Sequence, residues 1–137
     1  CRVDTFFVRG HLRAGEAIHQ FRQPTDDFGR SFSPVHRQGM FGISLDDLCY
    51  SYGLDFPSHI KVDVDGHEYA VVEGARRVLR DARLRSVLLE ITDSPDNAEE
   101  IKSMFAAFRD SGFTVLKKVQ TVPGREAHNV IFTRAGS

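Results

Sequence analysis

The segment from Ile60 to Glu68 constrains the fold of this chain more than any other part of the sequence. Its first residues are mostly apolar, two aspartates follow, and Gly66 precedes a stretch in which apolar residues recur with helical spacing. A buried strand that ends in a short loop and continues into a helix is typical of a layered α/β sheet. Ligands of such sheets bind at the carboxyl ends of the strands, so carboxylates at this place are candidates for chemistry.

Residues 44–137 alternate between expected helices and strands. The expected order is a helix that starts after Ser44 and ends at Gly53, a strand at 59–64, a helix at 67–80, a strand at 86–91, a helix from Pro95 to Gly112, and strands at 113–119 and 129–133. This alternation predicts parallel βαβ units in an α/β sheet. The last two strands are separated only by the turn Val122-Pro123-Gly124, which predicts an antiparallel hairpin at one edge.

Residues 1–43 are less regular. We expect short strands at 3–8, 16–23 and 40–43, and a long loop at 24–39 of the kind that usually carries function or motion. The length of 137 residues suits a single domain, with 1–43 as an irregular segment and 44–137 as the core. Because the first residue is Cys1 rather than Met, we expect the chain to be part of a longer protein.

Composition argues against several classes of protein. The net charge of -1 gives no global sign of binding to nucleic acid or to an anionic membrane. No apolar run approaches the roughly 20 residues that span a bilayer. The two cysteines form no metal or redox pattern, which favours a reducing compartment such as the cytoplasm. The six histidines are scattered without a His-x-x-x-His pair, so no metal site is expected.

The acidic loop supplies the candidate site residues. Asp63 and Asp65 share one face if the strand reaches that far, and Gly66 lets the chain turn and a ligand approach. Glu68 falls in the first helical turn, where a carboxylate suits the helix dipole. His67 is a candidate general base beside these carboxylates. The alternatives are that Asp65 or Glu68 caps the helix and that His67 is an ordinary histidine at a helix start.

Two residues on later strands belong to the same question. Glu90 ends the strand at 86–91, and it would lie beside Asp63 if the two strands are neighbours. It either lines the same crevice or caps the next loop. Asn129 begins the last strand and either reaches the crevice or serves as a turn residue.

Three motifs together point to a family. They are Leu45-Asp46-Asp47-Leu48, the segment Ile60–Glu68, and Glu73-Gly74-Ala75. This set resembles the FkbM-type methyltransferase domain, which has a Leu-Asp-Asp-Leu stretch, a Lys-x-Asp-x-Glu-Gly-x-Glu core and a Gly-Ala pair two turns later. Asp65 stands where that family usually has Glu. The strands at 88–91 and 129–132 also look like later strands of the family.

The resemblance implies a Rossmann-like class I methyltransferase sheet and the cofactor S-adenosylmethionine. Most members methylate hydroxyl oxygens of sugars or natural products, so the implied partner is a small-molecule acceptor. The resemblance also implies that Asp63 and Asp65 lie nearest to cofactor and substrate. With the candidates from the acidic loop, the expected catalytic residues are Asp63, Asp65, His67 and Glu68, and the expected cofactor-binding residues are Asp63 and Gly66. The sequence contains no Gly-x-Gly pair for a cofactor cradle. The chain therefore looks like the C-terminal half to two-thirds of such an enzyme, with a partial sheet.

Two other functions remain open at this point. The run Val62–Gly66 also looks like the nucleophile loop of haloacid-dehalogenase-type phosphatases, with Asp63 as nucleophile, Asp65 as acid/base and a magnesium ion. That loop continues with Thr and an apolar residue, whereas His67 and Glu68 follow here. The other alternative is a degenerate methyltransferase fold that serves as a binding module or homo-oligomer, because an incomplete sheet exposes an edge that invites pairing.

Overall fold

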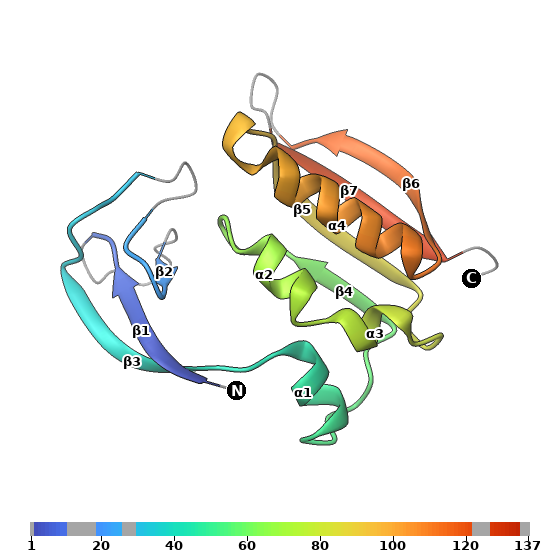
Figure 1. The fold of residues 1–137 in the computed structure, drawn as a ribbon, viewed down its shortest axis with the longest axis horizontal. Helices are drawn as coiled ribbons and strands as arrows, with labels where there is room; N and C mark the ends of the chain where they lie inside the picture. Colours follow the sequence, from blue (N-terminus) through green and yellow to red (C-terminus); the bar gives the residue numbers. More distant parts are fainter. Residues whose placement is uncertain (1, 11–18, 26–29, 122–126, 135–137) are drawn as a thin grey trace. The chain divides into compact units, whose positions relative to one another are not determined.

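The computed structural model describes residues 2–10, 19–25, 30–121 and 127–134. The chain divides into two compact units, Cys1–Ile43 and Ser44–Ser137 (Figure 1). The expectation of a single domain stays a prediction. No described helix is long and apolar enough to cross a membrane.

The first unit is built on a three-stranded antiparallel sheet with the order β2-β1-β3. Its strands are β1 (Arg2–Val8), β2 (Gln20–Phe21) and β3 (His36–Gly42). The expected strand at 3–8 is present, whereas the expected strand at 16–23 is short and lies partly outside the described residues. The expected loop at 24–39 is wrong at its end, because residues 36–39 pair with β1. Almost all of β3 is exposed, so it lacks the alternation of buried residues that predicts a strand.

The second unit holds a four-stranded sheet with the order β4-β5-β7-β6. Its strands are β4 (His59–Val62), β5 (Ser86–Thr92), β6 (Phe113–Gln120) and β7 (Ala127–Arg134). Only β4 and β5 are parallel, while β7 is antiparallel to both of its neighbours. The expected C-terminal hairpin is therefore present, but its connecting turn at 122–124 lies outside the described residues.

The expectation of a mostly parallel sheet is not confirmed, because the sheet is mixed. A second parallel neighbour of β5, on the side away from β4, would have to be β6, the strand that follows the next helix. Instead β7 lies between β5 and β6, so the hairpin contributes two antiparallel pairings and β6 becomes an edge strand.

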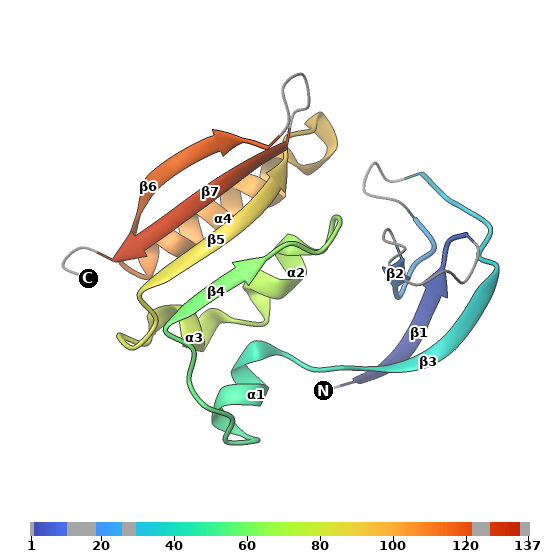
Figure 2. The same cartoon turned by 180° about the vertical axis from the view of Figure 1, so that it is seen from behind.

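Helices cover one face of this sheet. They are α1 (Leu45–Tyr50), α2 (Glu68–Glu73), α3 (Arg76–Arg80), a short 3-10 turn η1 (Pro95–Asn97) and α4 (Ala98–Asp110). Figure 1 shows α2, α3 and α4 in front of the strands, and Figure 2 shows the same unit from behind, with the strands in front. The layered α/β arrangement predicted for residues 44–137 is therefore present.

The helix boundaries show where local signals succeed. The Ser44 hydroxyl accepts a hydrogen bond from the Asp47 N–H (3.0 Å), so Ser44 caps α1 as predicted. Gly112, which follows α4, has φ +85°, a value that favours glycine at a helix end. The expected single helix at 67–80 is wrong, because it is interrupted at Gly74 and Ala75 and forms α2 and α3.

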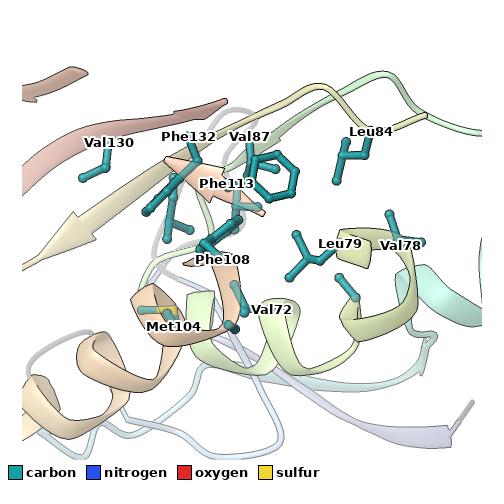
Figure 3. Close-up of a cluster of buried hydrophobic side chains, with 14 of the residues drawn as sticks. Val72, Val78, Leu79, Leu84, Val87, Met104, Phe108, Phe113, Val130 and Phe132 are labelled. Atoms are coloured by element: carbon teal, nitrogen blue, oxygen red, sulfur yellow. The ribbon is translucent and has the colours of Figure 1, made fainter. Parts of the chain in front are cut away.

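The hydrophobic core lies between the sheet and the helices (Figure 3). Val87, Leu89 and Ile91 alternate along β5 and point into it. Phe108 of α4 stacks on Phe132 of β7 with ring centroids 4.0 Å apart. Truncating either ring to Ala would cost roughly 3–5 kcal/mol. The core therefore holds α4 against the β5/β7 pair.

Arg134 joins the end of β7 to the ends of α3 and α4. Its guanidinium donates hydrogen bonds to four backbone carbonyls, those of Leu84 (2.8 Å), Ser111 (2.7 Å), Asp81 (3.1 Å) and Leu79. It also lies 4.4 Å from the centre of the Phe113 ring. A single cation thus satisfies carbonyls near the C-terminal ends of α3 and α4, those of Leu79 and Ser111, and two in the connection from α3 to β5.

Replacing this cation tests its structural role. We expect Arg134→Met to lower the free energy of unfolding by roughly 2 kcal/mol or more, because partly buried carbonyls lose their donor. The measurement is urea denaturation. Arg109→Met is a matched control, since Arg109 is 76% exposed and pairs with the neighbouring Asp110. A change of less than about 0.5 kcal/mol in both variants would contradict the assignment.

Candidate functional site

The acidic loop lies at the carboxyl end of β4. The strand ends at Val62, so Asp63 is the first residue of the loop. Asp63 Oδ2 is 2.6 Å from Lys61 Nζ, and both side chains are substantially exposed. The pKa of Lys61 is raised, first by its hydrogen bond to Asp63 and then by the Asp63 charge, with a smaller contribution from Glu90. An exposed pair of this kind adds little stability, but it offsets the charge of Asp63.

The chain turns sharply at Asp65 and Gly66. Their φ values are +40° and +87°, so both lie in the left-handed region. Aspartate tolerates this region better than most residues, and glycine enters it freely. Because β4 ends before Asp63, the strand face that Asp63 and Asp65 were expected to share does not form.

Glu68 is the first residue of α2, and its side chain folds back over the loop. Its Oε1 accepts a hydrogen bond from the Gly66 N–H (3.2 Å). Burial raises the pKa of Glu68, and hydrogen bonds from backbone amides partly oppose that rise. A carboxyl group that has a raised pKa and lies next to a strand end is a candidate general base.

His67 precedes α2 and makes no side-chain capping bond. Its Nε2 atom is buried and has no hydrogen-bond partner among the described residues. Leaving such an atom without a hydrogen bond costs about 1–3 kcal/mol. A ligand or water that forms a hydrogen bond with this atom would remove that cost.

Polar residues on the neighbouring strands β5 and β7 follow Asp63 across the sheet. Because Val62 pairs with Leu89, the next residues, Asp63 and Glu90, follow at the same level of the sheet. Glu90 in turn pairs with Asn129 of β7, whose buried Oδ1 has no hydrogen-bond partner within the described ranges. The strands β4 and β5 are neighbours, which is the condition under which Glu90 was expected to lie beside Asp63.

A second cluster of polar side chains was not predicted from the sequence. Asp93 Oδ2 lies 3.0 Å from His128 Nδ1 and 3.3 Å from Lys118 Nζ, just beyond the end of β5. The contact to His128 has the distance of an ion pair without the direction of a hydrogen bond. These residues are far apart in the sequence, so only the β5-β7-β6 pairing brings them together.

Comparisons with known proteins bear on this geometry. The family model described as "Methyltransferase FkbM domain" matches residues 10–115. No curated protein matches the chain. Among solved structures, fibrillarin from Aeropyrum pernix in complex with S-adenosyl-L-methionine is similar at a TM-score of 0.47 and 20% identity, over 69% of this chain. The chain spans 44% of the length of that fibrillarin.

The family match covers most of the sequence and includes the acidic loop and both flanking motifs, Leu45–Leu48 and Glu73–Ala75. The resemblance seen in these motifs is therefore confirmed. The chain belongs to the family of FkbM methyltransferase domains.

Proposed function

We propose that this chain forms part of the active site of an S-adenosylmethionine-dependent methyltransferase. The family match over residues 10–115, which includes the loop at the end of β4, is the observation that carries the proposal. The proposed reaction methylates a hydroxyl oxygen of a small molecule, such as a sugar or natural product. Cytoplasmic location remains part of the proposal.

The loop fits one side of the cofactor. S-adenosylmethionine carries an ammonium group and ribose hydroxyls that can donate hydrogen bonds to carboxylates, and a positive sulfonium that carboxylates attract by charge alone. Asp63 lies at the strand end, and the turn at Gly66 gives a ligand access to the backbone. We assign these two residues to the cofactor, with Asp65 beside them. The sequence offers no Gly-x-Gly cradle, so the fit is limited to this side.

Glu68 is the proposed general base. Its raised pKa brings the carboxyl group closer to neutral pH, where a base can accept a proton and later release it. The bound cofactor supplies the methyl group. Methyl transfer would break the bond between the methyl carbon and the sulfonium and release the cofactor as a neutral thioether. Glu68 would take the proton of the acceptor hydroxyl, and His67 would help orient that hydroxyl. Asp63 forms an ion pair with Lys61 and is better suited to electrostatic support.

The family match bears differently on the two alternatives, a phosphatase and a binding module. Membership of the methyltransferase family favours this assignment of Asp63 and Asp65 over the phosphatase interpretation of the same loop. A binding module or homo-oligomer with a degenerate site remains the competing proposal, and the binding experiment below separates it from an enzyme.

Cofactor binding is the most direct test of the proposed function. We expect the protein to bind S-adenosylmethionine in isothermal titration calorimetry, and Asp63→Asn to weaken that binding. Asp110→Asn is the control, because Asp110 ends α4 and its side chain is 64% exposed. Absence of binding by the unmodified polypeptide would support the degenerate module instead.

The second prediction concerns the base. We expect Glu68→Gln to lower kcat by about 10²–10⁴-fold with little change in cofactor affinity, as loss of a general base does. Transfer of a labelled methyl group to a panel of hydroxyl acceptors measures it. Glu99→Gln is the control, since Glu99 is 89% exposed on α4. Equal activity of the Glu68 and Glu99 variants would remove Glu68 from the mechanism.

The third prediction concerns stability. Because the folded-state pKa of Glu68 is raised above its ordinary value of 4.5, its favourable contribution is complete below that pH and is lost as pH rises through the folded-state pKa. We expect Glu68→Gln to be less pH-sensitive than the wild type, and at least as stable at pH 7. Urea denaturation between pH 4 and pH 8 measures this. A wild type that gains stability relative to Glu68→Gln with rising pH would contradict the shift.

A further inference from the structure

The helix α1 docks on the junction between α2 and α3. The Asp46 N–H donates a hydrogen bond to the Gly74 carbonyl (3.0 Å). A Cβ atom on Gly74 would lie 3.2 Å from the Ser44 Cβ, which is tighter than ordinary packing. The close approach of the two backbones therefore favours glycine at position 74.

The side chain of Asp46 caps α3 from a distance in sequence. Its carboxylate accepts hydrogen bonds from the N–H groups of Arg77 (2.9 Å) and Val78 (2.9 Å). These amides are in the first turn of α3, where no intrahelical partner exists. The residue at the cap position itself is Ala75, which has no polar side chain. The cap of α3 is thus supplied by α1.

Tyr50, one turn after Asp46, holds the other end of α3. Its hydroxyl donates to Asp81 Oδ2 (2.9 Å), and Asp81 directly follows the last residue of α3. The guanidinium of Arg77 lies 4.1 Å from the centre of the Tyr50 ring. The helix α1 therefore contacts both ends of α3, and we call this set of contacts the α1/α3 joint.

The joint adjoins α2, which carries Glu68 at its opposite end. The helix α2 has only the six residues from Glu68 to Glu73, and the buried Val72 anchors it in the core. Its C-terminal end is held at Gly74 by the hydrogen bond from the backbone N–H of Asp46. Because so short a helix moves as one body, a shift at Gly74 is transmitted to Glu68.

We propose that Asp46 is a positioning residue for the acidic loop. Its carboxylate fixes the first turn of α3, which follows Gly74 and Ala75, and thereby sets the direction of α2 and the place of the Glu68 carboxyl group over Gly66. The importance of this place for catalysis rests on the function proposed above, whereas the placement itself does not.

The test follows the Glu68 carboxyl group by NMR during a pH titration of the ¹³C-labelled chain. We expect Asp46→Ala to move the pKa of Glu68 back toward 4.5, because the carboxyl group loses its buried place. Asp46→Asn should retain much of the wild-type pKa, since its amide oxygen still accepts hydrogen bonds. The Gly66 amide shift should change together with Glu68.

Ser94→Ala is the matched control. The Ser94 hydroxyl caps η1 by accepting from the Asp96 N–H (3.2 Å), so its loss removes a helix cap elsewhere. A wild-type Glu68 pKa in this variant, together with a shifted pKa in Asp46→Ala, would support the positioning role. An unchanged pKa in both variants would mean that Asp46 is merely structural and would overturn the proposal.

Gly74→Ala gives a milder second variant if Asp46→Ala does not fold. It pushes Ser44 and Gly74 apart by a few tenths of an ångström, and we expect the pKa of Glu68 to shift in the same direction. An unshifted pKa in a folded Gly74→Ala protein would overturn the proposal. Neither titration needs cofactor or acceptor, so its outcome is independent of whether methyl transfer is observed.

Discussion

The junction between α2 and α3 depends on one carboxylate, that of Asp46. It satisfies two backbone N–H groups of α3 that no intrahelical carbonyl can reach, and leaving them without partners in a partly buried position would be costly. This cap allows a new helix to begin directly after Gly74. The motifs Leu45–Leu48 and Glu73–Ala75, which identify the family, thus form one tertiary contact and not two separate features.

In residues 44–137, the contacts that stabilise the fold lie apart from the locally unfavourable features. The core around Phe108 and Phe132 and the guanidinium of Arg134 hold the elements together. The loop at the end of β4 contains the unfavourable features: a non-glycine residue with positive φ at Asp65, an unsatisfied Nε2 on His67 and a carboxyl group with a raised pKa at Glu68. Unfavourable local features held by a rigid scaffold are typical of functional sites.

The sequence predicts those features that local chemistry determines. Helical and strand periodicity located most elements after Ser44, and the motif set identified the family. The interruption at Gly74 was not predicted, because its cause is a side chain about 30 residues earlier. The exposed strand β3 carries no burial pattern, and the insertion of β7 between β5 and β6 is a matter of topology. The grouping of Asp93 with His128 depends on the same topology.

Hydrogen–deuterium exchange of the Arg77 and Val78 amides in the wild-type chain tests this account most directly. Neither amide has a partner inside α3, so only Asp46 can protect them. We predict exchange about as slow as that of the Leu79 amide, which donates to the Ala75 carbonyl (2.8 Å) within α3. Exchange of Arg77 and Val78 at the rate of an unstructured peptide, with Leu79 protected, would contradict the account.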